Sequence, residues 1–164
     1  MGGGRGARGG GRGVPDVCET LARGDLDPNP GNLVLCEGNH AVARLFSVVG
    51  EDVDLYKMDI ALVMTMPRIP QFYYGTELLM TSATLERDDA SYRRDMPGGW
   101  AGDKADAFSG TGLTQQQREA QAFVRKLANW RKGQPVIHHG KMMHYGAEKG
   151  TYGYFRYEIG RAHA

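Results

Sequence analysis

The sequence has few cysteines, no long apolar run and no apolar signal segment. Only Cys18 and Cys36 are cysteines among 164 residues, and they form no closely spaced metal or redox motif. We therefore expect reduced, structural thiols and infer no compartment from them. No run approaches the roughly 18 apolar residues of a membrane helix, and the amino terminus has no signal core. The sequence thus predicts no membrane partner and leaves the localisation open.

An excess of charge of one sign is also missing, since 20 basic residues stand against 19 acidic ones and 41% of positions are hydrophobic. This is the composition of an ordinary soluble, globular protein. Residues 1–13 differ, with eight glycines and three arginines. An Arg-Gly tail would bind nucleic acid through charge and stacking, whereas a disordered leader or a mistranslated stretch needs no partner. The second interpretation is favoured, with no nucleic-acid partner, because no basic stripe follows.

The chain does contain a strand, a helix and a second strand in succession. Residues 33–36 are apolar on both faces and too short for a helix, as expected for a parallel strand covered on both sides. Asp52 or Asp54 caps a helix that is apolar on most sides up to residue 66, and Pro67 stops it. The next strand is expected around residues 69–74. This order predicts a right-handed βαβ crossover in an α/β fold.

Polar side chains follow both predicted strands. Glu37, Asn39 and His40 come after the first strand, and Glu77 comes after the second. The carboxyl ends of parallel strands meet at one edge of a sheet, where barrels and open sheets assemble their active sites. The sequence therefore predicts that the two strand ends, which carry these side chains, face the same way.

Several segments together resemble the α-amylase family, glycoside hydrolase family 13. Gly38-Asn-His-Ala-Val-Ala-Arg44 resembles the family motif Asn-His-Asp-x-x-Arg, and Ile69-Pro-Gln-Phe-Tyr-Tyr-Gly-Thr-Glu77 looks like the eighth barrel strand. Arg93-Arg-Asp-Met-Pro-Gly-Gly-Trp100, Asn129-Trp-Arg131 and Tyr154-Phe-Arg-Tyr157 are similar to the cyclomaltodextrinase and neopullulanase branch. The resemblance covers residues 18–157.

The resemblance implies a TIM (β/α)8 barrel followed by a small β-sandwich, and a full barrel needs about 250 residues. Only the last two β/α units are expected here, as a C-terminal fragment. Residues 18–134 would be the C-terminal part of the catalytic barrel, and residues 135–157 the start of the β-domain. Residues 1–17 and 158–164 are expected to be a Gly/Arg-rich leader and an unstructured tail, which we interpret as artefacts of an incomplete gene.

The function implied by the resemblance is retaining hydrolysis of α-1,4-glucosidic bonds in maltodextrins or cyclodextrins, as part of carbohydrate metabolism. The family's nucleophile aspartate and acid/base glutamate lie on earlier strands and have no counterpart in this sequence. Its third carboxylate, which stabilises the transition state, corresponds to Ala41. A methyl group neither accepts a hydrogen bond nor balances the charge of an oxocarbenium-like transition state. No catalytic residue is therefore intact. The alternative to a hydrolase fragment is a catalytically inactive carbohydrate-binding or structural remnant. Genuine loss of the carboxylate and a sequence error explain Ala41 equally.

The resemblance also implies an α-glucan oligosaccharide as the partner, with His40 bonding the sugar where cleavage occurs. Asn39 and Arg44 accompany His40 as substrate-binding candidates, although bracing the loop suits them better. Glu37 and Glu77 form a minor alternative acid/base pair, because retaining enzymes need carboxyl groups about 5–5.5 Å apart. The oligomeric state stays open.

Residues 82–113 form a long segment rich in Gly, Asp, Ser and Arg, and loops of this length are usually functional or disordered. In the family that the chain resembles, this segment helps to line the sugar cleft, which makes Trp100 the candidate platform for stacking on glucose, with a local hydrophobic anchor as the alternative. Arg93, Arg94 and Asp95 are candidate hydroxyl binders, although a solvated loop suits them better.

Thr114 and Gln117 form a capping box for a helix with an apolar stripe over residues 120–130, which includes Trp130 as a core residue. Gly133 and Pro135 end it.

Residues 136–145 and 151–157 are then expected to form a β-hairpin. His138, His139 and His144 invite a metal hypothesis, but no acid or Cys stands at ligand spacing and neighbouring strand residues point to opposite faces. We expect no metal or other cofactor in this chain, while the resemblance allows calcium in a full-length relative.

Overall fold

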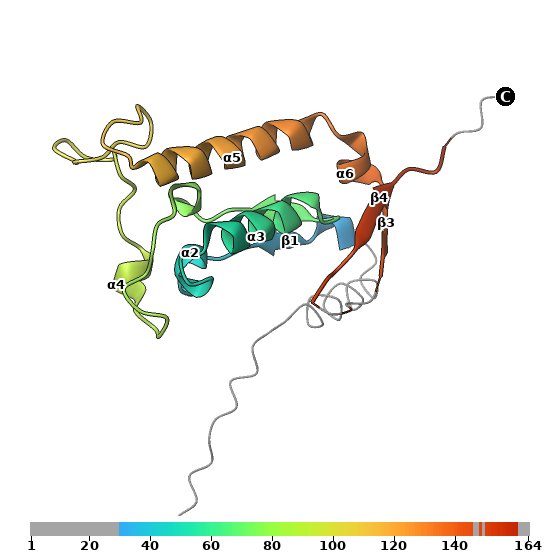
Figure 1. The fold of residues 1–164 in the computed structure, drawn as a ribbon, viewed down its shortest axis with the longest axis horizontal. Helices are drawn as coiled ribbons and strands as arrows, with labels where there is room; N and C mark the ends of the chain where they lie inside the picture. The colour runs from blue at the N-terminus through green and yellow to red at the C-terminus, as the bar shows by residue number, and fades with distance from the viewer. Residues whose placement is uncertain (1–29, 146–147, 149, 161–164) are drawn as a thin grey trace, which may run out of the picture.

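The computed structural model describes residues 30–145, 148 and 150–160. The predicted leader of residues 1–17 and the end of the predicted tail lie outside the described residues. After a short turn of 3-10 helix (η1, Pro30–Asn32), the chain forms a parallel pair of strands, several helices and an antiparallel hairpin. Figure 1 shows α5 running alongside α3, with α4 and its loops at one end and the hairpin at the other.

The first two strands, β1 (Val34–Cys36) and β2 (Ile69–Gln71), pair in parallel, with Val34 opposite Ile69. Helix α3 (Val53–Thr65) connects them, after a short helix α2 (Leu45–Val48). The Asp52 side chain accepts hydrogen bonds from the amides of Asp54 and Leu55 at 2.8 and 3.0 Å, and it therefore caps α3. The predicted strand, helix, strand order and the α/β fold are confirmed.

The expectation that the first strand is covered on both faces is wrong, and the second strand is exposed in the same way. Val34 is 52% exposed and Ile69 is 51% exposed. The sheet has two strands within the described residues, and the first and last residue of each strand are exposed. Apolar residues that would be buried in a sheet covered on both faces therefore stay in contact with solvent.

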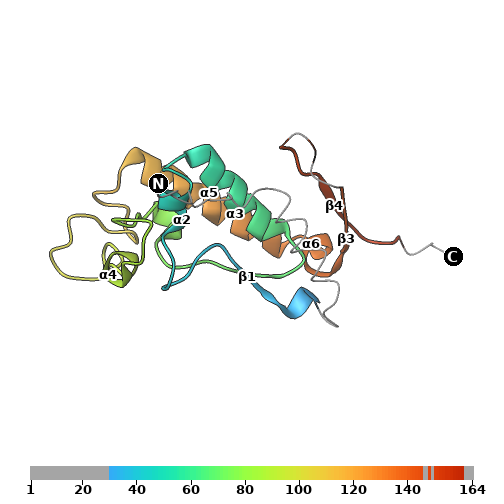
Figure 2. The ribbon, with the colours of Figure 1, turned by 90° about the horizontal axis from the view of Figure 1, so that it is seen from below.

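Helix α5 (Gln115–Lys132) begins at the predicted capping box, in which the Gln117 amide donates to the Thr114 hydroxyl at 3.2 Å and Gln117 Oε1 accepts from the Thr114 amide at 3.0 Å. Its residue Ala120 packs into a core with buried side chains of α2, α3 and the segment after β2, which are Leu45, Phe46, Tyr56, Ile60 and Leu79. In Figure 2 α3 and α5 again lie side by side, which agrees with this shared core.

Trp130 was expected in the core, but it is 42% exposed and Arg131 is buried instead. The stripe of α5 that faces the core runs through Ala120 and the partly buried Val124 and Leu127 to Arg131, in helical period. The Arg131 guanidinium donates to the carbonyl oxygens of Met64, in the last turn of α3, and of Arg68, between α3 and β2. A charged side chain occupies this position because the last carbonyls of a helix and the segment that follows offer it acceptors.

The hairpin is formed by β3 (Lys141–His144) and β4 (Tyr154–Tyr157), which pair antiparallel with Met143 opposite Phe155. The prediction of a strand over residues 136–139 is wrong, because these residues lie in a short helix, α6 (Pro135–His139). Pro135 does not end α5 but begins α6, since proline is well suited to the first helical turn. Gly133 caps α5, as predicted.

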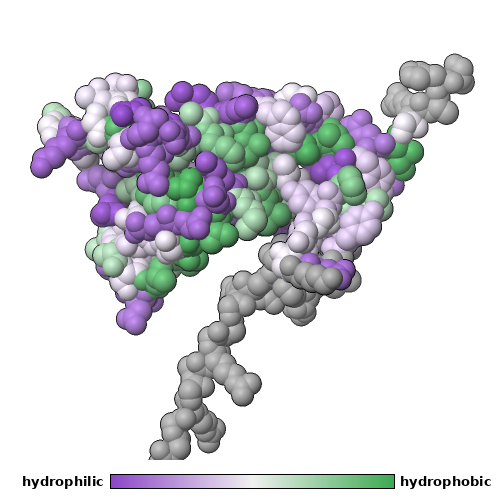
Figure 3. All heavy atoms as spheres, in the orientation of Figure 1, coloured by the Kyte–Doolittle hydropathy of each residue, from purple (hydrophilic) through white to green (hydrophobic). Residues whose placement is uncertain are grey.

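The surface is mixed in character. Figure 3 shows hydrophobic surface gathered over α2 and α3, where the exposed apolar side chains include Val48, Leu55 and Met58. Hydrophilic residues prevail along α5. No helix in the described part of the chain has the length and apolar character needed to cross a membrane.

Candidate functional site

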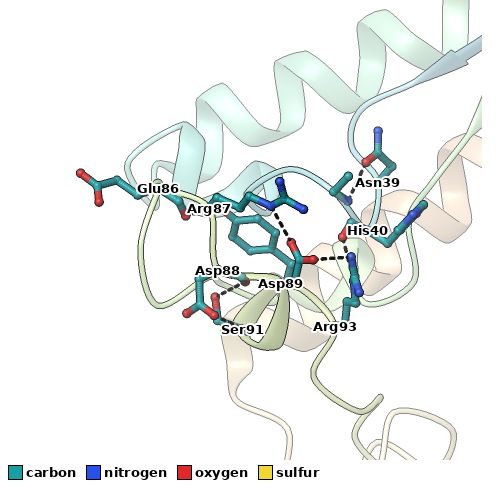
Figure 4. Close-up of polar contacts among 10 residues, drawn as sticks. Asn39, His40, Glu86, Arg87, Asp88, Asp89, Ser91 and Arg93 are labelled. Atoms are coloured by element: carbon teal, nitrogen blue, oxygen red, sulfur yellow. Dashed lines mark hydrogen bonds and ion pairs between the residues drawn. The ribbon is translucent and has the colours of Figure 1, made fainter.

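The loop that follows β1 is built around Asn39, His40 and Ala41. The Asn39 side-chain oxygen accepts a hydrogen bond from the Ala41 amide at 2.8 Å, which closes a tight turn of the Asx type. His40 and Ala41 are exposed on this turn. In Figure 4 the His40 ring points away from the segment that holds its backbone. The turn therefore presents the imidazole to solvent and supports the bracing role for Asn39.

Arg44 ends the same loop and is only 2% exposed. Its guanidinium carbon lies 4.4 and 4.6 Å from the ring centroids of Tyr73 and Tyr74, and the group donates to the Tyr74 carbonyl. The Arg44 amide donates to the Ser82 hydroxyl at 2.7 Å. Burial between two aromatic rings ties the β1 loop to the segment after β2, which also supports bracing over sugar contact.

Glu37 connects the two strand ends. Its Oε1 accepts a hydrogen bond from the Tyr73 amide at 2.9 Å. Burial raises the pKa of the Glu37 carboxyl, while hydrogen bonds from the Thr76 side chain and the Tyr73 amide oppose this rise. Glu77 lies in a turn of 3-10 helix, η2 (Thr76–Leu78). Both predicted carboxylates thus lie beyond the strand ends, and Glu37 links the end of β1 to the segment after β2 through its hydrogen bond with the Tyr73 amide.

Below these carboxylates, the hydroxyl of Tyr56 donates to the Thr76 carbonyl at 3.1 Å. Burial raises the pKa of the Tyr56 phenol, and the charges of Glu77 and Glu37 add to this effect. Burial likewise raises the pKa of Asp59. Tyr56 is fully buried, and its hydrogen bond to Thr76 supports the segment after β2 from inside the fold.

Arg93 contacts the His40 loop with its guanidinium group, as Figure 4 shows. Its Nε donates to the His40 carbonyl at 3.0 Å, and its Nη2 lies 2.8 Å from Asp89 Oδ2. Asp89 belongs to helix α4 (Asp89–Tyr92), whose amino end is capped by Asp88 through the Ser91 amide at 3.3 Å. A capped helical turn therefore fixes the arginine that holds His40.

The next two residues along the chain make equally defined contacts. Arg94 donates to the Thr81 carbonyl, and its own carbonyl accepts from the Tyr74 hydroxyl at 2.8 Å. Asp95 Oδ2 accepts a hydrogen bond from the indole nitrogen of Trp100 at 3.1 Å. Residues 93, 94 and 95 thus contact the His40 loop, the segment after β2 and Trp100 in turn.

Trp100 is 68% exposed, although both its backbone and its indole N–H are held. Asp103 Oδ2 accepts from the amides of Gly98 at 2.9 Å and Trp100 at 3.2 Å. Gly98 adopts a φ of 94°, and a Cβ there would lie 2.5 Å from Asp106 Oδ1, so glycine is required for this turn. Trp100 lines a shallow cavity of about 250 Å³ together with Asp95, Met96, Pro97, Asp103, Lys104 and Ala105.

The predicted candidates His40 and Trp100 are therefore each hydrogen-bonded to the short segment of residues 93–95. The sequence did not identify the residues that contact Arg44, Arg93 and the turn before Trp100. They are Tyr73 and Tyr74, Ser82, Asp89 and Asp103. The Tyr-Tyr pair after the second strand was the one visible signal, because an aromatic pair beside a strand end is a ready partner for an arginine.

The described residues contain no group of three or more His, Cys, Asp or Glu that would hold a metal ion. They offer no ligand set for the calcium that the resemblance allows in a full-length relative. His138 and His139 lie on α6, and His138 Nε2 bonds the Arg131 carbonyl at 2.8 Å. Cys36 is a free, exposed thiol.

No family model matches the chain. Among characterised proteins it is 31% identical, over 100 residues, to a maltogenic alpha-amylase from Bacillus acidopullulyticus, covering 61% of this chain and 14% of that enzyme. The chain therefore spans only a small part of the relative's length.

The fold is similar to parts of several solved alpha-amylase structures. An Anoxybacillus alpha-amylase superposes with a TM-score of 0.68 and 18% identity, over 89% of this chain and 29% of that one. The alpha-amylase from Geobacillus thermoleovorans in complex with acarbose gives 0.65 and 17%, over 87% and 29%. A gamma-CGTase from alkalophilic Bacillus clarkii gives 0.59 and 24%, over 85% and 18%. The chain is thus similar in sequence to part of a maltogenic alpha-amylase, and similar in fold to parts of solved alpha-amylases.

Proposed function

We propose that this chain is the glucan-binding C-terminal part of a retaining α-glucan hydrolase of the cyclomaltodextrinase, neopullulanase or α-amylase type. Residues 18–134 would supply the last two β/α units of the barrel, and residues 135–157 the start of a β-sandwich domain. The complete enzyme would cleave α-1,4-glucosidic bonds in maltodextrins or cyclodextrins. The chain by itself would bind such a glucan and not hydrolyse it.

The observation that carries this proposal is the exposure of His40 and Trp100 on loops whose backbones are held by hydrogen bonds. An exposed tryptophan with its indole N–H fixed offers one flat apolar face and a polar rim. An exposed imidazole supplies a donor or an acceptor to a hydroxyl group. Together they suit a ligand with both apolar faces and hydroxyl groups, such as glucose units in a chain.

Hydrolysis is not expected, because the exposed side chain at position 41 is a methyl group. Glu37 is already engaged by the Tyr73 amide, which makes it a poor substitute. The second candidate function is a carbohydrate-binding or structural remnant whose lineage has itself lost catalysis, and the same methyl group favours it.

Calorimetric titration of the purified chain with maltoheptaose and β-cyclodextrin tests the proposal. We expect measurable binding that His40→Ala and Trp100→Ala each weaken by about tenfold, or roughly 1.4 kcal/mol. Trp130→Ala is the matched control, because Trp130 is also partly exposed but lies on α5. Absence of binding would leave the structural remnant as the better function.

A reducing-sugar assay on the same sample tests the chemistry. We expect no release of glucose or maltose, because no transition-state carboxylate is present in the His40 loop. Steady release that Glu37→Gln or Glu77→Gln abolishes would contradict this and would identify those carboxylates as the catalytic pair.

A further inference from the structure

A second cavity lies outside the candidate site, between the end of α2 and residues 82–85. Its volume is about 340 Å³, and its lining includes Ser47, Gly50, Glu51, Ser82, Thr84 and Leu85. Cavities that bind small molecules typically measure about 300–1,000 Å³. The space between α2 and residues 82–85 is therefore large enough for a small ligand.

Hydrogen bonds hold the two walls of this cavity together. The Ser82 amide donates to the Ser47 hydroxyl at 2.9 Å, and the Arg44 amide donates to the Ser82 hydroxyl at 2.7 Å. On the rim, the Glu86 amide donates to the Thr84 hydroxyl at 3.1 Å. The walls are thus formed before any ligand binds, which lowers the entropic cost of binding.

The lining combines hydroxyl groups, one carboxylate and one apolar side chain. Ser47, Ser82 and Thr84 supply the hydroxyl groups, which both donate and accept, and Glu51 supplies a carboxylate that accepts. Leu85 is 63% exposed and adds apolar surface. Within the described part of the chain, no lysine, arginine or histidine lines the cavity. This chemistry suits a neutral ligand with several hydroxyl groups and an apolar face, and it disfavours an anion.

Glu51 has a backbone conformation that its packing does not explain. It adopts a φ of 60°, in the left-handed region that disfavours side chains other than glycine. Among the described residues Leu79 shares this property, but Leu79 is buried in the core, which accounts for it. The Glu51 side chain is exposed, and its carboxylate makes no hydrogen bond or ion pair within the described part of the chain. A strained residue with a free polar group at the rim of a cavity points to a role in binding.

From these observations we propose that the cavity is a second sugar site, in which the Glu51 carboxylate and the hydroxyl groups of Ser47 and Thr84 bond the hydroxyl groups of one pyranose ring. The site goes beyond the proposed function, because neither candidate glucan contact lines it. A free sugar and a unit within a glucan chain offer the same hydroxyl groups, so maltose and maltoheptaose are both needed as probes.

Nuclear magnetic resonance titration of the full chain with maltose locates the site. We expect the amide signals of Gly50, Glu51 and Thr84 to shift in a saturable manner. Shifts with maltoheptaose but not with maltose would assign the site to a glucan chain and support the inference. Absence of shifts at these amides with both sugars would overturn it. Shifts with calcium chloride and with neither sugar would identify a cation site and also overturn it.

Glu51→Gly separates binding from folding. Glycine adopts a positive φ at little cost, so this variant should unfold at a higher urea concentration than the wild type. It also lacks the carboxylate, and hydrogen bonds to a charged group are strong enough for their loss to weaken maltose binding by about tenfold or more. A loss of binding in a protein of raised stability cannot come from unfolding. Unchanged maltose affinity in Glu51→Gly would overturn the inference.

Glu86→Gln is the matched control for charge and location. Glu86 is exposed in the segment that forms one wall, it does not line the cavity, and its side chain points away from the other labelled residues in Figure 4. We expect Glu51→Gln to weaken maltose binding severalfold and Glu86→Gln to leave it unchanged. Equal losses in the two variants would attribute the effect to net charge and overturn the inference.

A variant that carries both His40→Ala and Trp100→Ala separates this site from the proposed function. The shifts at Gly50, Glu51 and Thr84 should persist in it, because neither replaced residue lines the cavity. If wild-type shifts occur at these amides and not around His40 or Trp100, the proposed function fails and the second site stands. Shifts confined to the surroundings of His40 and Trp100 would support the proposed function and overturn the second site.

Discussion

Replacement of Arg131 by methionine should destabilise the fold strongly, although Arg131 touches no candidate site residue. Its guanidinium belongs to a residue that is 9% exposed, and it donates to the Met64 carbonyl and, at 3.1 Å, to the Arg68 carbonyl. Hydrogen bonds that involve a charged partner contribute about 1.5–3 kcal/mol each. The two bonds together would then be worth about 3–6 kcal/mol.

Two effects reduce this figure. Burial lowers the pKa of Arg131, which shows that its charged form loses hydration in the fold. Methionine recovers some apolar burial in the same space. We therefore expect a net loss of about 3 kcal/mol in the free energy of unfolding, or about 6–12 °C in Tm.

Urea unfolding followed by far-UV circular dichroism measures this loss as a lower midpoint with an unchanged slope. Lys132→Met is the control, because Lys132 is the exposed neighbour on α5 and should change stability by less than about 0.5 kcal/mol. Equal midpoints for the two variants would refute the conclusion that Arg131 stabilises the end of α3.

Three further predictions concern the capping box, the strand ends and position 41. Thr114→Ala should cost about 1 kcal/mol, measured by the same urea titration, because it removes the acceptor for the Gln117 amide; no loss would mean that the start of α5 contributes nothing to stability. Because burial raises the pKa of Glu37 in the fold, the native state binds its proton more tightly, and wild-type stability should fall as pH rises from the ordinary glutamate pKa through the raised one. Glu37→Gln should flatten this dependence in urea titrations from about pH 4 to 8, and an unchanged slope would contradict the direction of the shift. When the upstream strands of a close relative are joined to the chain, Ala41→Asp should raise kcat at least about a thousandfold, or roughly 4 kcal/mol, with little change in affinity; equal activity with and without this substitution would show that position 41 is not the stabiliser.

Much of the fold was predictable because the deciding signals are local. Asp52 and Thr114 mark helix starts through bonds to residues two or three positions away. The burial of Trp130 and Arg131 was predicted wrongly because both residues lie near the apolar stripe. Which of them is buried depends on the carbonyls of Met64 and Arg68, which are 67 and 63 residues away from Arg131. Exposure of the strand faces was missed for the same reason, since apolar residues predict burial without saying what covers them.

The candidate residues could be named from the sequence, but not the contacts that hold them in the fold. His40 stood out in a polar cluster after a strand, and Trp100 in a glycine-rich loop. The contact from Arg93 to the His40 carbonyl spans 53 residues and uses a backbone acceptor, which no side-chain pattern reveals. Arg93 and Asp95 were therefore interpreted as sugar ligands or a solvated loop, and their engagement with the protein became visible only in the fold.

The geometry of the His40 loop does not depend on the side chain at position 41. Asn39 bonds the backbone amide of Ala41, Arg93 bonds the backbone carbonyl of His40, and Arg44 anchors the end of the loop beneath Tyr73 and Tyr74. None of these contacts uses the exposed methyl group of Ala41. Loss of a carboxylate there would remove charge stabilisation of a transition state while leaving the proposed contact of His40 with a sugar in place. If His40 binds sugar as proposed, binding and catalysis are separable in this loop, and the carboxylate introduced by Ala41→Asp would enter a turn that is already formed.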